Sequence, residues 1–162
     1  MKVLNIHKAI IHQSKDEVSK LLKTLSTEND KIWPFEKWPA MKFNKGLVEG
    51  ANGGHGPIRY SIEKYEPKEF IQFKFSKPIG FNGIHKFEIL KLENEKTELK
   101  HTIDMNVVGK GLLIWLIAIH PLHNALLEDA LHKVKNNYIL DNKQNKWGIW
   151  VKLLRRLLKK RS

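Results

Sequence analysis

The segment PIRYSIEKYEPKEFIQFKFSK, residues 57–77, alternates apolar and polar side chains on both sides of a central EPK. Alternation with a period of two is typical of β-strands with one buried face, and a proline between polar residues is typical of a turn. The segment therefore predicts a β-hairpin. A four-residue loop would pair Ile62 with Ile71 and Tyr60 with Phe73, which places all four side chains on one face of the sheet.

Two later segments continue the pattern and extend the hairpin into an antiparallel meander. GIHKFEILKLE (83–93) and TELKHTIDMNVV (97–108) alternate in the same way around an NEK turn. Before the hairpin, GLVEGA (46–51) is expected to lead through a glycine-rich loop, NGGHG (52–56), whose glycines supply the positive φ of a tight turn. A sheet with one apolar face needs a cover on that face. The apolar face that this register predicts consists of Ile58, Tyr60, Ile62, Ile71, Phe73, Phe75, His85, Phe87, Ile89, Leu99, His101, Ile103 and Met105.

The N-terminal part predicts a strand followed by a short helix. Residues 2–12 are rich in β-branched side chains, which is typical of a strand. Ser14 with Glu17 three positions later forms a capping box, in which each side chain bonds a free backbone N–H of the first helical turn. Apolar residues at helical spacing extend the expected helix over 15–26.

The longest helical segment lies near the C-terminus and is large enough to cover the sheet. It spans 111–139 and is expected to break at Pro121, which suits the first turn of a second helix. The preceding LLIWLIAI, residues 112–119, is apolar all round and is expected to be deeply buried. The alternatives for it are a dimer contact and a turn that dips into a membrane. The apolar face after the proline consists of Leu122, Leu126, Leu127, Ala130, Leu131 and Val134.

Three segments resemble a known superfamily. GHGPIRYSIEKYEP (54–67), GFNGIHKFEIL (80–90) and HPLHNALLEDAL (120–131) are similar to the START-like or SRPBCC superfamily of polyketide cyclase-like proteins, and within it to a bacterial branch. The resemblance implies an α+β helix-grip fold, in which a curved antiparallel sheet wraps around a long C-terminal helix. Residues 1–140 would form this domain, and residues 141–162 would follow it as a basic amphipathic helix.

The resemblance also implies a cavity between sheet and long helix that holds a small hydrophobic or amphipathic ligand, and it supplies no catalytic residue. We expect binding or carriage of such a ligand, without a cofactor. The alternative is an enzyme of the cyclase, dehydratase or aromatase type, with His85 or His101 as its acid/base group. Because no nucleophile or paired acid lies near either histidine in the sequence, binding is favoured over catalysis. The rings of Trp33, Phe35 and Trp38 are expected to pack an ordered loop. The expected ligand-binding residues are Tyr60, Ile62, Ile71, Phe73, Phe75, His85, Phe87, His101, Ile103, Met105, Leu127 and Leu131.

Composition and spacing exclude or disfavour several chemistries. The 162 residues contain no cysteine, which excludes disulfides, thiolate catalysis and cysteine-based zinc sites. His120 and His123 can share a helical face, but no carboxylate stands at a third-ligand position, so we expect no metal site. GANGGHG lacks the lysine of a phosphate-binding loop. The N-terminus lacks the apolar stretch of a signal peptide, and the longest apolar run is far shorter than the roughly 20 residues that span a bilayer. We expect a cytoplasmic protein.

The C-terminal segment KWGIWVKLLRRLLKKRS, residues 146–162, predicts a basic amphipathic helix. The last 22 residues contain eight Lys or Arg and one Asp, so they carry +7 of the net charge of +12. One side of the helix is basic, with Lys152, Arg155, Arg156, Lys159 and Lys160. The opposite side is apolar, with Trp147, Trp150, Val151, Leu153, Leu154, Leu157 and Leu158.

Such a helix can lie on an anionic membrane, dock on its own domain or on another subunit, or bind nucleic acid. Nucleic-acid binding needs a basic surface but no broad Leu and Trp stripe opposite it, so it is disfavoured. Apolar side chains, Trp near the headgroups and Lys or Arg facing anionic lipid are what an interfacial helix needs, so the composition favours a membrane surface. A third hypothesis is a regulatory interaction protein that acts through this tail. The expected membrane-binding residues are Trp147, Trp150, Lys152, Leu154, Arg155, Arg156, Leu158 and Lys159.

Overall fold

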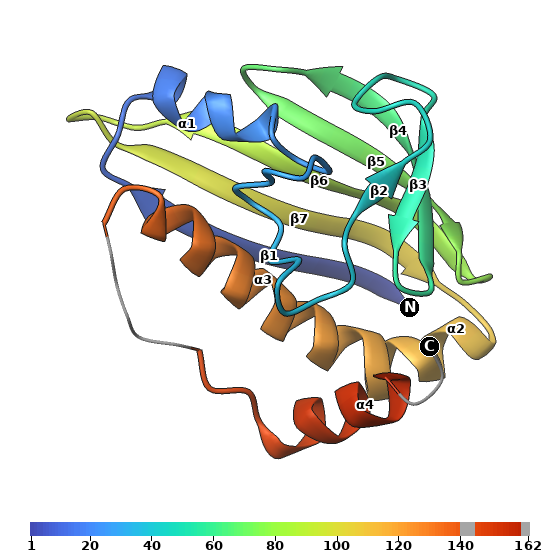
Figure 1. The fold of residues 1–162 in the computed structure, drawn as a ribbon. Coiled ribbons are helices and arrows are strands. Elements are labelled where there is room, and N and C mark those ends of the chain that lie inside the picture. Colours follow the sequence, from blue (N-terminus) through green and yellow to red (C-terminus); the bar gives the residue numbers. More distant parts are fainter. Residues whose placement is uncertain (140–144, 160–162) are drawn as a thin grey trace.

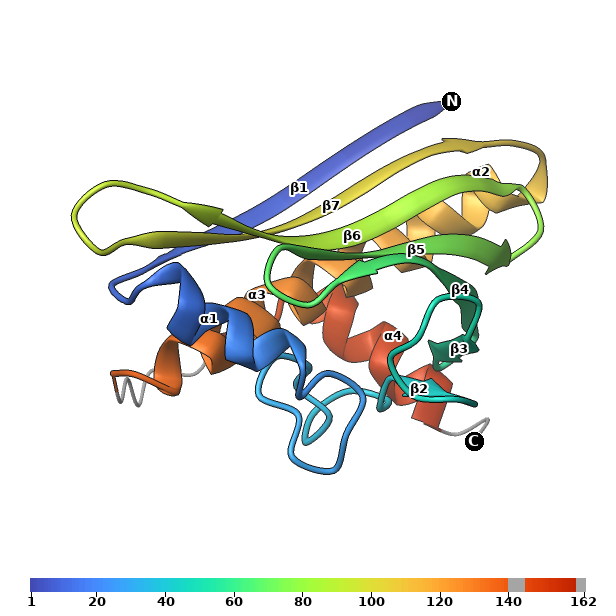
Figure 2. The same cartoon turned by 90° about the horizontal axis from the view of Figure 1, so that it is seen from above.

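A computed structural model describes residues 1–139 and 145–159 of the chain. Residue 159 is described by its backbone alone. A curved antiparallel sheet wraps around one long helix, which is the α+β helix-grip architecture (Figure 1). The sheet has seven strands in the order β1-β7-β6-β5-β4-β3-β2. Helices α1, α3 and α4 all lie on the same side of it (Figure 2). The elements are β1 (Lys2–Ile11), α1 (Lys15–Leu22), β2 (Lys42–Phe43), β3 (Asn52–His55), β4 (Ile58–Glu66), β5 (Phe70–Lys77), β6 (Phe81–Lys91), β7 (Thr97–Val107), α2 (Lys110–Ile114), the π-helical turn η1 (Trp115–Ile119), α3 (His120–Asn136) and α4 (Ile149–Lys159).

The hairpin formed by β4 and β5 has the predicted faces but a different register. Ile62 pairs with Phe73 and Tyr60 with Phe75, two residues along β5 from the predicted partners. The loop is tighter than expected, because Glu66 already pairs with Phe70, and the register shifts at a bulge between Ile62 and Lys64. A displacement by two residues keeps every side chain on its own face. The predicted apolar face is therefore confirmed: its members are buried, apart from the half-buried Phe75.

The glycine-rich segment before this hairpin is a strand and not the predicted loop. Residues 52–55 form β3, the turn lies at Gly56 and Pro57, and 46–51 contain no strand. Glycine is needed in β3 because neighbouring backbone approaches it closely. A Cβ on Gly53 would overlap the Lys42 carbonyl oxygen, and a Cβ on Gly54 would overlap that of Ile58.

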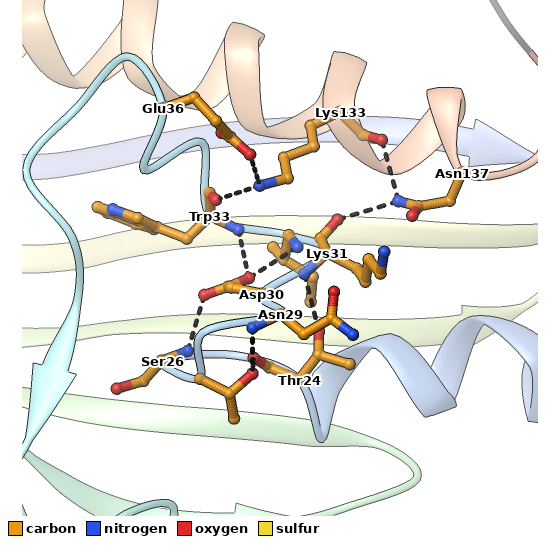
Figure 3. Close-up of polar contacts among 11 residues, drawn as sticks. Thr24, Ser26, Asn29, Asp30, Lys31, Trp33, Glu36, Lys133 and Asn137 are labelled. Carbon is orange, nitrogen blue, oxygen red and sulfur yellow. Dashed lines mark hydrogen bonds and ion pairs between the residues drawn. The ribbon is translucent and has the colours of Figure 1, made fainter.

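Helix α1 starts as predicted and ends four residues early. The Ser14 hydroxyl accepts a hydrogen bond from the Glu17 backbone N–H at 3.3 Å. The helix ends at Leu22, because the following chain turns around the buried carboxylate of Asp30, which accepts the backbone N–H of Ser26 at 2.7 Å (Figure 3). Ser26 itself has a φ of 65°, which is incompatible with a continuing α-helix.

The long helix runs through Pro121, so the predicted break is wrong. Helix α2, the π-helical turn η1 and helix α3 follow one another without a gap. In η1 the His120 backbone N–H bonds the carbonyl of Trp115, five residues earlier. Pro121 has no N–H to offer Ile117, and the Ile117 carbonyl instead accepts the Trp150 indole N–H at 2.8 Å.

Residues 112–119 are not deeply buried, which corrects a second expectation. Trp115 is buried, whereas Leu113, Leu116 and Ile117 are 62%, 51% and 54% exposed. By length and composition alone, Lys110–Asn136 is apolar enough to cross a membrane, a property it shares with core helices of globular proteins. Here its inner side faces the sheet, and Leu113, Leu116 and Ile117 on the outer side of its first half remain more than half exposed.

Candidate functional site

A cavity of about 620 Å³ lies between the sheet, the long helix and α4. It has room for roughly twenty water molecules, and its size is typical of small-molecule sites. Most of its wall is apolar. The lining residues are Trp33, Phe35, Glu36, Lys37, Trp38, Pro39, His55, Gly56, Pro57, Ile58, Phe75, His85, His101, Ile103, Trp115, Ile119, Leu122, His123, Leu126, Arg155 and Leu158.

The predicted ligand-binding residues divide into two groups. Phe75, His85, His101 and Ile103 line the cavity. The other eight are buried in the surrounding core, where aromatic rings fill the space between them; Phe43, for example, stacks on Phe73 with centroids 5.7 Å apart. These eight, which the structure places behind the wall, are Tyr60, Ile62, Ile71, Phe73, Phe87, Met105, Leu127 and Leu131.

Four histidines, two of them buried and two half-buried, form a polar part of the cavity wall. His85 Nδ1 lies 3.4 Å from His101 Nε2, and His123 approaches His101 with a centroid distance of 5.1 Å. His55 Nδ1 lies 2.9 Å from the Tyr60 hydroxyl. Burial lowers the pKa of His55 to about 3 and the pKa values of His85, His101 and His123 well below the usual 6.5. All four imidazoles are therefore neutral at pH 7.

Three of these imidazoles have a ring nitrogen without a partner among the described residues. They are His85 Nε2, His101 Nδ1 and His123 Nδ1. A neutral imidazole carries one donor and one acceptor nitrogen. If one nitrogen of the His85–His101 pair donates to the other, the two remaining nitrogens must present one donor and one acceptor. An unpaired buried polar atom lowers stability by about 1–3 kcal/mol, so these nitrogens are polar groups that the surrounding protein does not satisfy.

The histidines do not converge on a metal ion. In the described part of the chain, no three His, Asp or Glu side chains lie close enough to hold one. His120 Nε2 instead lies 3.2 Å from Asn124 Nδ2, and its ring packs on Trp115. His123 lines the cavity and His120 does not, although their spacing in the sequence suggested that they share a helical face.

One rim of the cavity is the loop of residues 33–39, which Asp30 and α3 hold in place. Asp30 Oδ1 accepts the backbone N–H of Trp33 at 2.7 Å, and Trp33 Nε1 donates to the Pro39 carbonyl at 2.9 Å. Lys133 on α3 donates to the Trp33 carbonyl at 2.9 Å and to Glu36 Oε1 at 2.7 Å (Figure 3). The three aromatic residues predicted only to pack this loop also line the cavity.

Helix α4 lies beside this loop at the rim, and one buried carboxylate joins the two. Asp129 on α3 accepts the indole N–H of Trp38 at 2.8 Å and that of Trp147 at 2.9 Å. Arg155 lies between these two indoles, with its guanidinium 4.1 Å from the Trp38 ring and 4.0 Å from the Trp147 ring. Arg155 also donates to the Lys37 carbonyl. The tail thus docks on its own domain, one of the three alternatives left open by the sequence.

The predicted membrane-binding residues lie on different sides of the docked helix. Trp147, Leu154 and Arg155 are half-buried against the domain, and Leu158 lines the cavity. Trp150, Lys152 and Arg156 are exposed to solvent. The side chain of Lys159, and the whole of residues 140–144 and 160–162, lie outside the described part of the chain.

The fold is shared with solved structures of low sequence identity. CalU16 from Micromonospora echinospora has a TM-score of 0.57 and 14% identity, over 99% of this chain and 92% of its own. Norcoclaurine synthase from Thalictrum flavum, in complex with a transition-state analogue, has a TM-score of 0.61 and 11% identity, over 85% of this chain and 98% of its own. A START superfamily protein from Mycobacterium smegmatis has a TM-score of 0.54 and 12% identity, over 83% and 98%.

These similarities concern the fold and do not extend to sequence families. No protein-family model matches the chain, and no curated protein matches it in sequence. The predicted START-like, SRPBCC-type helix-grip fold is confirmed by the structural matches. Proteins with this fold include ligand-binding proteins and enzymes, so the fold alone does not fix the activity.

Proposed function

We propose that this chain, which has the START-like helix-grip fold, binds a small amphipathic ligand in its cavity. The observation that carries the proposal is a partly open cavity of about 620 Å³ with a mainly apolar wall and a few grouped polar side chains. The apolar body of a ligand would lie against Phe75, Ile103 and Leu126. Its polar group would face either the histidines or Arg155 at the rim.

A cavity-filling substitution tests this proposal. Leu122→Trp should weaken binding of anilinonaphthalene sulfonate, a fluorescent amphipathic probe, at least about tenfold, because the indole would occupy space that the probe needs. Leu113→Trp is the matched control on the exposed outer side of the same helix, and it should leave the affinity unchanged. Circular dichroism checks that both variants are folded. Equal affinity of the folded variants for the probe would contradict the proposal, whereas a small molecule retained by the purified protein in native mass spectrometry would support it.

An acid/base enzyme is the second candidate, and the contact between His85 and His101 favours it. Two linked imidazoles can take up a proton at one end and release one at the other, as cyclase and dehydratase chemistry requires. The same mass-spectrometric measurement separates the two candidates. A binding protein retains one compound, whereas a dehydratase or aromatase retains a pair of compounds that differ by one water.

We also propose that the exposed side of α4 holds the protein, expected to be cytoplasmic, on anionic membranes. Trp150, Leu153 and Leu157 are 47%, 45% and 54% exposed, at helical spacing i, i+3 and i+7. Lys152 and Arg156 are exposed beside them, and α4 contains no acidic residue. Each basic residue near an anionic surface contributes about 1 kcal/mol, and buried apolar area adds about 25 cal/mol per Å².

Vesicle co-sedimentation tests this membrane contact with variants that keep every charged residue. Leu153→Ser combined with Leu157→Ser should weaken binding to phosphatidylserine-containing vesicles at least about tenfold, because two apolar side chains no longer enter the bilayer. Leu4→Ser combined with Ile6→Ser is the matched control, since it removes from β1 two apolar side chains that are at least half exposed. Binding should need anionic lipid and weaken only partly with salt. If both double variants bind like the wild type, the outer side of α4 is not the contact.

A further inference from the structure

The apolar stripe of α4 consists of two parallel rows with different environments. The inner row is Val151, Leu154 and Leu158, preceded by Trp147 just before the helix. Val151 is 8% exposed and Leu154 is half-buried against the domain, whereas Leu158 lines the cavity and is 44% exposed. The outer row, Trp150, Leu153 and Leu157, faces solvent. We propose that the cavity rim and an anionic bilayer compete for the inner row, so that membrane binding removes α4 from the cavity and opens it toward the lipid.

The inner row is held by contacts that a bilayer surface can replace. Leu154 and Val151 pack on the domain, and lipid chains offer them an equally apolar environment. The Trp147 indole donates to Asp129, and the Arg155 guanidinium lies between two indole rings. Lipid phosphate and carbonyl oxygens accept hydrogen bonds from the same two groups. Release of α4 onto a bilayer therefore gives each of these side chains a contact of similar kind, while the exposed outer row is buried in addition.

The exposed apolar surface of the outer row continues onto the long helix. Trp150 donates to the Ile117 carbonyl, which joins α4 to the exposed apolar side of α2 and η1. There Leu113, Leu116 and Ile117 are more than half exposed. Residues 110–127 contain no acid and one lysine, and α4 contains four basic residues. This combined surface is apolar and basic, which fits an anionic bilayer better than it fits a neutral or acidic partner.

The position of this surface determines what it would open. Arg155 and Leu158 belong to the cavity wall, so moving α4 removes wall residues on the side that faces the bilayer. A ligand could then pass between cavity and lipid without crossing water. The inference rests on the proposed membrane contact. The two equilibria are linked. If the membrane favours the open cavity by a given factor, a ligand that keeps the cavity closed weakens membrane binding by the same factor.

A cysteine introduced into the cavity wall measures the opening, because the natural chain contains no cysteine that could react. Leu126 is buried and lines the cavity, so the thiol of Leu126→Cys should react slowly with a maleimide in solution. Phosphatidylserine-containing vesicles should accelerate the reaction about tenfold or more, within the usual range of coupling between two sites. Vesicles of neutral phosphatidylcholine should not. Lys91→Cys, at an exposed position at the end of β6, is the control and should react at one rate throughout.

The outcomes separate this inference from the proposals on which it rests. If the Leu126→Cys protein co-sediments with anionic vesicles but its thiol reacts no faster, α4 stays on the cavity and the inference is wrong, while the membrane contact stands. If it does not co-sediment, the membrane contact itself fails and the inference fails with it. Acceleration that disappears when Leu153→Ser and Leu157→Ser are added, with slow reaction retained in solution, supports the inference.

Discussion

Lowering the pH from 7 to 5 is expected to destabilise the protein by several kcal/mol. Burial lowers the folded-state pKa values of His55, His85, His101 and His123, whereas in the unfolded chain all four take up a proton near pH 6.5. Below that pH the unfolded chain binds more protons than the folded one, so stability present above pH 6.5 is lost as the pH falls toward the folded-state pKa values. Each histidine contributes up to about 1.4 kcal/mol per pH unit.

Unfolding in urea at a series of pH values measures this loss. The effect should be strong because the cationic forms would also repel one another: His7 and His120 lie near His123, and Arg59 lies near His55. His101→Gln should reduce the pH dependence by up to one proton, since the amide does not titrate. His12→Gln is the control, because His12 is exposed, and its profile should follow the wild type. A free energy of unfolding that stays constant between pH 7 and pH 5 would show that the histidines are not held neutral by burial.

The sequence predicts the sheet better than the site because the two depend on different kinds of information. Alternation along β4 to β7 identifies the buried face locally. The assignment of this face stays correct although the predicted partner of Ile62 was wrong by two residues. That buried face still does not reveal which of its residues border a void. Phe73 lies behind the wall because Phe43, thirty positions earlier, stacks on it. Such contacts depend on the tertiary arrangement of side chains, which alternation does not encode.

The residues missed at the rim have a similar explanation. The loop of Trp33 and Trp38 has no periodicity, and its position depends on Asp30 and on Lys133 from a distant helix. Its two Trp-Pro pairs were the available signal, since they predict an ordered aromatic loop that must lie against something. The docking of α4 was less visible still, because a Leu and Trp stripe suits a membrane and a protein surface equally well. The structure distinguishes the two through Asp129, a buried acid of the long helix that accepts the Trp147 indole N–H.

Asp129→Ala should cause the largest loss of stability among single substitutions at the rim, about 3–5 kcal/mol. The Asp129 side chain is almost completely buried and accepts hydrogen bonds from the indoles of Trp38 and Trp147 and from Asn145, and it lies 3.4 Å from the ammonium group of Lys37. Alanine would leave these donors without an acceptor at the junction of the 33–39 loop, α3 and α4. Asp129→Asn keeps one acceptor oxygen and should destabilise the protein less.

Glu128→Ala is the matched control, because it removes an exposed acid from the neighbouring position of α3 and should change the free energy of unfolding by less than about 0.5 kcal/mol. Urea unfolding followed by circular dichroism measures all three variants. Tryptophan emission adds a local readout, since Trp147 and Trp38 would meet water once the carboxylate no longer holds them. An Asp129→Ala protein as stable as Glu128→Ala, with unchanged emission, would mean that Arg155 and the apolar row hold α4 without the carboxylate. A large loss of stability accompanied by red-shifted emission would instead identify Asp129 as the group that fixes the helix over the cavity.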